Sequence, residues 1–543
     1  MPKPASTLAP FRHGNFRNIW TANLASNLGG LVQGVGAGWM MTTITDSHNM
    51  VSLVQGATTL PIMIFSIAAG ALADNFDRRR IMLVAQAFMM GVSVCLAIWT
   101  FLGLLSPWML LGFTFLIGCG TALNNPSWQA SMGDIVPRED LPSAVSLNSM
   151  GFNLMRSVGP AIGGIIVATA GAVAAFAFNA LSYIPLFFAL FRWRSTPAQR
   201  TLPRERFGGA MAAGVRYVAM SPKLLTVLAR GFAFGLGAVS IAALLPTIAS
   251  EYVGGSAFTY GTMLGCFGAG AIGGALINAR AREKLANEII ARLACLGFAL
   301  SCAGLGLSRD VLLSHAVLLP AGVCWVLALS LFNVTIQLST PRWVVGRALS
   351  LYQTATFGGM AAGSWVWGVT SDSFSPTIAL LGAALVLLGC AAIGFRFSLP
   401  EFGNVNFDPS DPFREPAVAL DIRPQSGPIV VEIEYDIAPE DIPAFLRLMA
   451  VRRRIRIRDG ARRWALRRDL ERPEIWSEIY HVPTWVEYVR HLQRRTMADG
   501  ENSAQLLALH RGADRPRVRR TIERPTVPLR DDTPYRDHPE VST

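Results

Sequence analysis

The sequence has little charge for its length. Of its 543 residues, 15% are Asp, Glu, Lys or Arg, whereas 51% are hydrophobic and the mean hydropathy is +0.37. A soluble chain of this size would carry far more charge, so the composition indicates a protein with several membrane spans. Residues 1–397 hold 24 Lys and Arg against 12 Asp and Glu, which accounts for the formal net charge of +12. This excess lies between apolar runs, where it sets orientation and does not indicate nucleic-acid binding.

Several sites that would carry chemistry are missing. All seven cysteines lie in apolar runs without metal-ligand spacing, so we expect no metal site, no cofactor and no disulfide framework. No G-x-x-x-x-G-K-[ST] loop occurs, which predicts secondary rather than ATP-driven transport. The N-terminus shows no cleavable signal segment, so the first span should direct insertion. We therefore expect that the protein is not an enzyme.

Carboxylates are absent from the middle of every predicted span, where a proton relay is usually sought. Asp46 and Glu251, at the ends of the first and seventh spans, are the remaining candidates for ion coupling. The sequence leaves open whether the coupling ion is a proton or another ion.

Apolar runs of spanning length fall into two groups of six. We expect spans near 18–43, 51–73, 81–104, 108–131, 144–170, 172–191, 224–249, 259–279, 289–307, 311–332, 348–370 and 376–397. An offset of 204 residues carries Gly70-Ala71-Leu72 onto Gly274-Ala275-Leu276, Pro137 onto Pro341 and Gly159 onto Gly363. Duplicated six-helix halves around a midplane site are the architecture of alternating-access transporters.

Basic residues set the predicted orientation. They gather at the termini and in every second loop, including Arg78–Arg80 and the stretch 192–223, whereas the opposite loops contain only Arg309. The positive-inside rule therefore places both termini in the cytoplasm. The expected location is a bacterial-type inner membrane.

The first loop with a specific pattern joins the second and third predicted spans. It contains Gly70, Leu72 and Asp74, followed by Arg78, Arg79 and Arg80. This stretch resembles the signature loop of the major facilitator superfamily, although Asp77 stands where the family usually has a second glycine. The resemblance implies a gating loop, with its aspartate facing the end of a neighbouring helix and its arginines facing the membrane surface.

A second pattern lies in the fifth predicted span, where Gly159, Pro160, Gly163 and Gly164 form a Gly-Pro-x-x-Gly-Gly core. It resembles the fifth-helix motif of exporters in the same superfamily, although Leu147 and Met155 occupy upstream glycine positions. Together with the first loop, it resembles the branch of enterobactin exporters and transmembrane secretion effectors. The glycines permit close helix approach and Pro160 permits a bend; plain small-residue packing explains each glycine as well.

Arg156 is the most informative single residue. It lies near the middle of the fifth predicted span, where a lone guanidinium is costly unless water, carbonyls or an anion compensate it. Two interpretations are about equally supported: an anion-coordinating residue in a central cavity, or an arginine satisfied by neighbouring neutral dipoles. Other candidates for lining a cavity are the uncharged polar residues within spans, namely Asn23, Asn27, Asn124, Asn153 and Gln353.

After residue 398 the pattern changes. Alternation over 431–437 predicts a strand, 439–456 a helix, 462–469 and 474–482 two strands, Thr484 the start of a second helix, and 517–523 a last strand. The order β-α-β-β-α-β favours a ferredoxin-like module and weakly resembles antibiotic-biosynthesis monooxygenase domains. Self-association through this module is one of the partner interactions that we consider.

The predicted fold class is thus an all-α membrane protein of twelve transmembrane helices with a small cytoplasmic α+β domain. The expected divisions are a first half (1–192), a linker (193–223), a second half (224–398), a linker (399–428), the α+β domain (429–524) and a disordered tail (525–543). The expected function is secondary active export of an amphipathic small molecule such as a siderophore or secreted metabolite, with anionic molecules among the options. The alternatives are a broad multidrug/proton antiporter and a membrane-anchored enzyme or sensor.

Overall fold

The computed structural model describes residues 8–137, 139–193, 207–341, 343–401, 418–494, 496–511 and 514–523; the side chains of 70, 71, 73–75, 142, 153, 157, 207 and 210 are not described. The chain forms two compact units. The first consists of Met1–Phe207, Lys223–Gln337 and Leu349–Glu401, and the second of Gly208–Pro222, Leu338–Ala348 and Phe402–Thr543. The predicted tail, residues 194–206 of the first predicted linker and residues 402–417 of the second lie outside the described residues, and the predicted domain limits stay a prediction.

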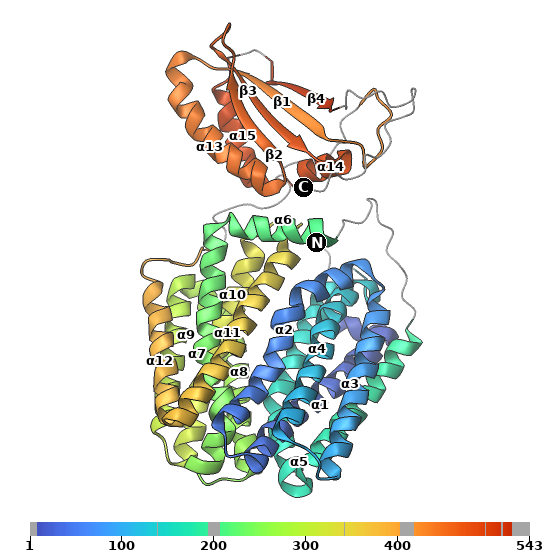
Figure 1. Cartoon of the computed structure of the whole chain (residues 1–543), viewed down its shortest axis with the longest axis vertical. Coiled ribbons are helices and arrows are strands. Elements are labelled where there is room, and N and C mark those ends of the chain that lie inside the picture. Colours follow the sequence, from blue (N-terminus) through green and yellow to red (C-terminus); the bar gives the residue numbers. More distant parts are fainter. Residues whose placement is uncertain are drawn as a thin grey trace. The chain divides into compact units, whose positions relative to one another are not determined.

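The first unit is a bundle of long helices (Figure 1). In chain order they are η1 (Ala9–Arg12), α1 (Gly14–Ile44), α2 (His48–Asn75), α3 (Arg78–Phe101), α4 (Pro107–Ile135), α5 (Leu141–Arg192), α7 (Pro222–Thr247), η2 (Ile248–Tyr252), α8 (Ala257–Lys284), α9 (Asn287–Leu307), α10 (Val311–Leu338), α11 (Val345–Ser373) and α12 (Pro376–Ile393). Gly171, at φ +77°, interrupts α5 and divides it into two helices, because only glycine adopts this backbone conformation without steric cost. The break falls where the sequence separates its fifth and sixth predicted spans.

Local sequence explains where several helices begin. A side-chain oxygen at the N-cap accepts a hydrogen bond from a free backbone N–H of the first turn. Ser47, Asp77, Ser106 and Ser375 do this at the starts of α2, α3, α4 and α12.

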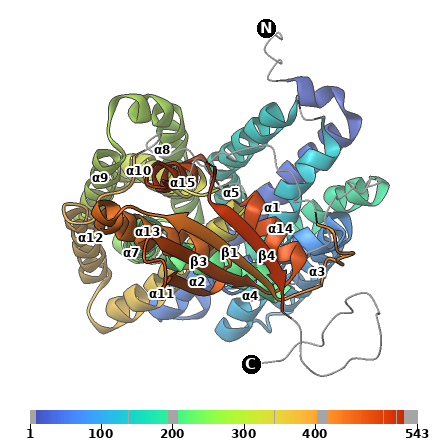
Figure 2. The ribbon, with the colours of Figure 1, turned by 90° about the horizontal axis from the view of Figure 1, so that it is seen from above.

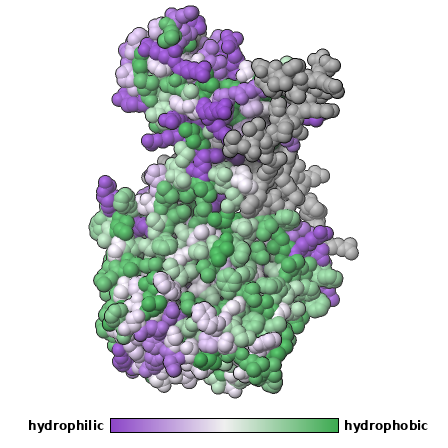
Figure 3. Space-filling model, viewed as in Figure 1, coloured by the Kyte–Doolittle hydropathy of each residue, from purple (hydrophilic) through white to green (hydrophobic). Residues whose placement is uncertain are grey.

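Nine helices in the described part of the chain are long and apolar enough to cross a membrane. The set counts Ser143–Arg192 once and does not include α1 or α11, which are helical over two of the predicted spans. Both helices carry polar or small residues along their length, which lowers their hydropathy. On the face drawn in Figure 3, hydrophobic side chains cover most of this unit, as a lipid environment requires.

The second unit contains a four-stranded antiparallel sheet (Figure 2). Its C-terminal elements are β1 (Ile429–Asp436), η3 (Pro439–Asp441), α13 (Ile442–Asp459), β2 (Arg462–Arg468), β3 (Ile475–Val482), α14 (Trp485–Gln493), α15 (Met497–Ala508) and β4 (Arg517–Ile522). The strand order is β2-β3-β1-β4, and Val431 faces Tyr480 in β3 and Arg520 in β4. All predicted strands and helices of this region are present, and α15 is an additional helix.

The core of this sheet lies on one face. Along β1, alternate residues from Ile429 to Tyr435 are buried against Phe445 of α13, Tyr488 of α14 and Leu506 of α15. All three helices therefore pack on the same face of the sheet, and the alternation seen in the sequence marks that face.

Helix α6 (Phe207–Ala219) and residues 338–348 belong to this second unit. The rings of Tyr217 and Trp343 meet edge to face at 5.6 Å. Arg458 lies over Tyr217 at 5.0 Å, and Arg494 lies over Trp343 at 4.3 Å. Two cation–π contacts thus join the end of α13 and the end of α14 to these aromatic residues.

Candidate functional site

The arginine-rich loop between α2 and α3 is held by the ends of other helices. Arg78 donates to the carbonyl of Ala130 at 2.8 Å and to the carboxylate of Asp134 at 2.9 Å. Arg79 donates to the carbonyls of Leu190 and Phe191 at 2.8 and 2.7 Å. Leu190 and Phe191 belong to the last turn of α5, where backbone acceptors have no partner within the helix, and Ala130 lies five residues before the end of α4.

The expectation that all three arginines face the membrane surface is therefore wrong for Arg78 and Arg79, which cap helix ends inside the first half. Arg80 alone is exposed, with 85% of its side chain accessible, at 3.7 Å from Asp77. Gly70, Leu72 and Asp74 lie in the last turns of α2. Leu72 is half-buried, whereas the side chains of Gly70 and Asp74 are outside the described part of the structure.

The fifth-helix motif packs against two helices. Gly159 and Gly163 lie against Leu31 and Val32 of α1, and Gly159 and Pro160 are both buried. A Cβ added to Gly164 would lie 2.8 Å from the Cα of Gly261 in α8, so the two backbones are in contact. Because α5 and α8 belong to different halves, this glycine pair forms a seam between the halves that has no room for a side chain.

Arg156 lies on α5 fifteen residues from Leu141 and fifteen from Gly171. At 1.5 Å per residue, it is about 22 Å from each end of that helix. Its guanidinium lies 5.2 Å from the centroid of the Trp325 ring in α10, across the boundary between the halves. No carboxylate among the described residues pairs with Arg156.

Trp325 belongs to an aromatic cluster of the second half. Its ring lies 5.9 Å from Phe267, and the cluster also includes Phe234, Phe298 and Phe332. The Nε1 of Trp325 is buried without a hydrogen-bond partner. A cation at the edge of an aromatic cluster can bind a molecule that has both an anionic group and an apolar or aromatic part.

The remaining cavity candidates have different surroundings. Asn124 is buried and accepts a hydrogen bond from Gln86 of α3 at 3.2 Å. This hydrogen bond joins the neighbouring helices α3 and α4. Asn23 is buried, whereas Asn27 and Gln353 are half-buried. The side chain of Asn153 lies outside the described residues. Among the described residues, the structure therefore groups Arg156 with Trp325, and no hydrogen bond joins it to Asn23, Asn27, Asn124 or Gln353.

The two candidates for ion coupling lie at one end of the bundle, which we call the acidic end: the α1–α2, α7–α8 and α11–α12 connections with Asp46, Glu251 and Asp372. Asp46 is exposed, and no ion pair joins it to another described residue. Glu251 pairs with His48, whose Nε2 lies 3.0 Å from Oε1 and 3.1 Å from Oε2. His48 Nδ1 lies 3.0 Å from the hydroxyl of Ser371 in α11.

The helices α2 and α11 meet along a seam of polar contacts. Ser47 donates to Asp372 at 2.8 Å at the acidic end, and Ser66 lies 2.8 Å from the hydroxyl of Thr354 nearer the opposite end. The halves are thus joined by two seams of different kinds, hydrogen-bonded at α2–α11 and backbone-to-backbone at α5–α8.

The C-terminal sheet contains a buried charge cluster. Glu478, fully buried, lies 2.9 Å from Arg456 and 3.6 Å from Arg452, and accepts hydrogen bonds from Trp464 and Tyr435. Burial alone would raise the pKa of Glu478, but the two arginines outweigh it and lower the pKa to about 2. Both arginines pair with the same carboxylate inside the fold, and such internal pairing is typical of a structural core.

A second buried acid lies at the end of α13. Asp459 pairs with Arg458 at 2.9 Å. Burial raises the pKa of Asp459 to about 6, and this effect exceeds the opposite effect of Arg458. Asp459 therefore changes charge much closer to neutrality than an ordinary aspartate does.

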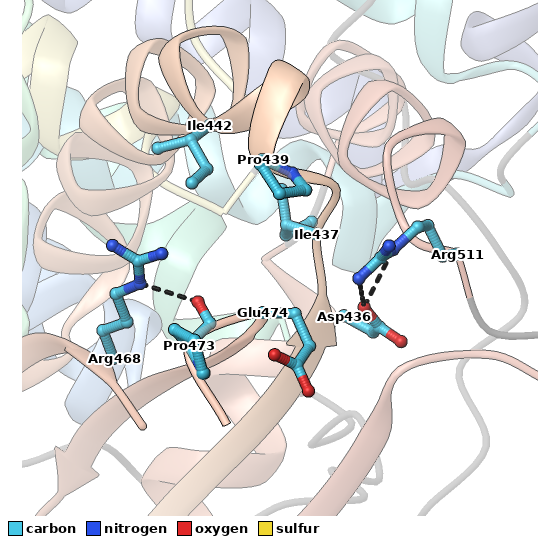
Figure 4. Close-up of a pocket in the computed structure, with 8 residues that line it drawn as sticks. All are labelled: Asp436, Ile437, Pro439, Ile442, Arg468, Pro473, Glu474 and Arg511. Atoms are coloured by element: carbon cyan, nitrogen blue, oxygen red, sulfur yellow. Dashed lines mark hydrogen bonds and ion pairs between the residues drawn. The ribbon is translucent and has the colours of Figure 1, made fainter. Parts of the chain in front are cut away.

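The second unit also has an open cleft of about 580 Å³ at the end of β1 and the start of β3 (Figure 4). Arg511 closes one side by pairing with Asp436 at 2.7 Å, and Arg468 donates to the carbonyl of Pro473 at 2.6 Å. With Glu474, the lining carries two positive and two negative side chains, so it does not select a ligand by charge. No group of three His, Cys, Asp or Glu within the described ranges could hold a metal ion.

The family sequence model of transmembrane secretion effectors matches residues 5–526. The chain therefore belongs to this family of the major facilitator superfamily. Among its relatives, the enterobactin exporter EntS of Escherichia coli O1:K1 is 25% identical over 69% of this chain and 90% of its own. The macrolide efflux protein A of Streptococcus pyogenes is 24% identical over 53% and 73%.

The staphyloferrin A transporter of Staphylococcus aureus is 28% identical over 29% of this chain, and the match spans only 40% of that relative. Among solved structures, a bacterial homologue of the human lysosomal transporter Spinster has a TM-score of 0.57 at 12% identity, covering 72% of this chain and 97% of that chain. The nucleoside transporter NupG has a TM-score of 0.58 at 11% identity, covering 71% and 99%. These likenesses show the fold. The family and its structural neighbours are transporters, so the protein is a multi-pass membrane transporter and not an enzyme.

Sequence reasoning missed the partners of the residues it selected. His48 is the first residue of α2 after a serine N-cap, a position that suggests no role, yet it binds Glu251. Trp325 lies in an apolar run, where nothing distinguishes an aromatic residue of the core from one that faces Arg156. The Thr496–Asp499 capping box was a usable signal for α15.

Proposed function

We propose that the protein is a secondary exporter that moves an amphipathic, anionic small molecule by alternating access. All twelve predicted spans would cross the membrane, six in each half. Both termini and the arginine-rich loops, such as the one with Arg78–Arg80, would lie in the cytoplasm. Nine candidate spans, the break of α5 at Gly171 and the helical state of α1 and α11 support this count. The C-terminal unit would be a ferredoxin-like domain, which its strand order β2-β3-β1-β4 supports.

The observation that carries the proposal is the position of Arg156. A guanidinium halfway along a spanning helix needs compensation, because the bilayer interior does not solvate charge. Trp325 offers the face of a ring and no negative charge. Since no described carboxylate pairs with Arg156, an anionic group of the substrate supplies the compensation when it binds. The aromatic cluster behind Trp325 then contacts its apolar part.

The substrate class is a siderophore or another secreted acidic metabolite. Relatives named as exporters or transporters of enterobactin and staphyloferrin A support this class over cationic drugs. The carboxylates or catecholates of such molecules would match the planar, two-pronged donor of arginine.

Export assays on one anionic and one cationic compound, normalised to protein in the membrane, test the proposal. Arg156→Lys keeps the charge but loses the fork, so we expect export of the anionic compound to fall about tenfold. Arg156→Gln should abolish that export while the cationic compound is unaffected. Equal loss of both compounds would show that Arg156 is structural and would end the anion-binding proposal.

A broad multidrug/proton antiporter is the second candidate. The macrolide efflux relative favours it, and so does the titratable pair of His48 and Glu251. Export of chemically unrelated cations, unchanged in Arg156→Gln, would select this alternative. Coupling to a proton or another ion, self-association and a sensing role for the C-terminal unit stay proposals.

A further inference from the structure

The pair of His48 and Glu251 joins the two halves at the acidic end. His48 begins α2 in the first half, whereas Glu251 and Ser371 belong to the second half. The side chain of His48 is 19% exposed and that of Glu251 is 48% exposed, so water and protons reach the pair. The contact is made by side chains alone, so it can break without disturbing either half.

The hydrogen bonds of His48 suit both charge states of its ring. Nε2 faces a carboxylate, so this nitrogen carries a hydrogen and donates it to Glu251. In the neutral ring, Nδ1 accepts from the Ser371 hydroxyl at 3.0 Å. In the cationic ring, Nδ1 can donate to the Ser371 carbonyl at 3.3 Å. A proton can therefore bind without moving the ring, and it changes a hydrogen bond between a neutral ring and a carboxylate into an ion pair.

Other charged groups surround this pair. Asp372 of α11 is occupied by Ser47 at 2.8 Å, and Asp46 of the α1–α2 connection is exposed. Arg309 lies over the ring of Tyr252, the residue that follows Glu251 in the chain, at 4.0 Å.

The backbone at Glu251 is unusual. Ile248–Tyr252 is a π-helical turn that follows α7 and lies directly after Pro246 and Thr247. Turns of this kind occur frequently at functional sites because they reorient side chains within a helix. Here the turn carries the carboxylate that meets the other half.

We propose that His48 and Glu251 form a proton-binding latch, in which protonation of His48 holds the acidic end closed and loss of the proton eases its opening. The inference rests on the alternating access of the proposed function and adds to it a residue pair and a ligand, the proton. A histidine is suited to this role because its charge changes between pH 5 and 8. Nothing in the argument depends on which molecule is exported.

The seam itself provides the test. Ser47→Cys with Asp372→Cys places two thiols where a hydrogen bond now joins the halves, and the rate of disulfide formation reports closure of the acidic end. The rate in full-length protein with His48 is divided by the rate in the same protein with His48→Gln, at pH 5.5 and at pH 8. The pH dependence of thiol chemistry cancels in this ratio. Chains with one introduced cysteine measure reaction with native cysteines.

We expect a ratio of about five at pH 5.5 that falls toward one at pH 8; fivefold corresponds to about 1 kcal/mol, the strength of an accessible ion pair. Glu251→Gln should bring the ratio to one at both pH values, because it removes the charge and keeps the hydrogen-bonding shape. A ratio independent of pH, or one that survives Glu251→Gln, would overturn the latch.

The chain offers a matched control. His13 lies 2.9 Å from Asp140, and both belong to the first half, so this histidine–carboxylate pair does not join the halves. His13→Gln should leave the crosslinking rate unchanged at both pH values; an equal effect would show that any lost histidine alters the seam. If His48→Gln fails to fold, His48→Asn serves in its place. The crosslinking experiment contains no substrate, so its result is independent of the export assay. The latch proposal can therefore be confirmed when the export proposal fails, and it can fail when the export proposal is confirmed.

Discussion

Two arginines of this protein, one in each compact unit, differ in whether a carboxylate accompanies them. Arg456, in the core of the C-terminal sheet, is 2% exposed and lies 2.9 Å from Glu478. Arg156, midway along α5, faces Trp325 and has no described carboxylate partner. A buried charge that has a partner is satisfied within the fold, whereas one that lacks a partner is available to a ligand. The first is therefore a structural element and the second a candidate binding group.

A third arginine helps to separate the two cases. Arg230 of α7 is buried within the bundle and pairs with Glu288 of α9, which Arg292 also contacts at 2.9 Å. The bundle thus provides a carboxylate where an arginine is structural, so the lack of one at Arg156 is not a general property of its helices.

The largest expected effect is on the paired arginine of the sheet. Glu478→Gln leaves Arg456 and Arg452 buried without a negative charge, which should lower the free energy of unfolding of the C-terminal unit by about 3–5 kcal/mol. Hydrogen exchange of peptides from β1 and β3, measured in the full chain, reports this loss. Glu434→Gln, on the opposite face of β1, should change protection by less than about 0.5 kcal/mol. Equal protection in both variants would mean that the cluster is not structural.

A smaller effect separates the two arginines of the bundle. Arg230→Gln leaves Arg292 as the remaining described arginine that pairs with Glu288, so we expect a loss of about 2 kcal/mol in the free energy of unfolding. Arg156→Gln leaves no described carboxylate behind, and its loss should stay below about 1 kcal/mol. Thermal unfolding of the detergent-solubilised protein compares the two. If Arg156→Gln were the more destabilised, the comparison with Arg456 would fail and Arg156 would be structural.

The sequence predicted elements better than partners. The strand at 429–436 and the helix at 485–493 follow from alternation and a capping box, which are local properties. The helix α15 was missed because residues 499–503 in its first half are polar or glycine and show no helical periodicity of apolar residues. The depth of Arg156 followed from counting residues, but no periodicity indicates that Trp325, some 170 positions away, faces it.

Arg78 and Arg79 show why contacts between distant parts of the chain could not be predicted from the sequence. Their acceptors are mainly backbone carbonyls near the ends of α4 and α5. Every residue has such a carbonyl, so the acceptor leaves no trace in the sequence, and a basic loop beside a membrane is most simply interpreted as facing lipid. The same holds for Gly164 and Gly261, whose contact depends on which two helices meet.

The smallest expected effect depends on pH and concerns Asp459, a second buried acid of the C-terminal unit. Burial raises its pKa from 3.8 to about 6 in the folded protein. A raised carboxyl pKa means that the folded state binds the proton more tightly than the unfolded state, so stability increases as the pH falls from about 6 toward 4. Glu478 has the opposite sign, since its pKa is lowered from 4.5 to about 2. Its contribution is present above pH 4.5 and is lost below that value.

As the pH falls from 7 to 5, therefore, only Asp459 of these two acids should take up a proton in the folded protein. This protonation should stabilise the C-terminal unit by about 1 kcal/mol. Hydrogen exchange of peptides from α13 and β3, corrected for the intrinsic effect of pH, should show this gain in the full chain. Asp459→Asn cannot take up the proton and should abolish the gain. Asp436→Asn breaks a partly exposed pair with Arg511 and should leave it intact. A gain that persists in Asp459→Asn would assign the pH response to another group and would leave Asp459, like Arg456, a purely structural part of the core.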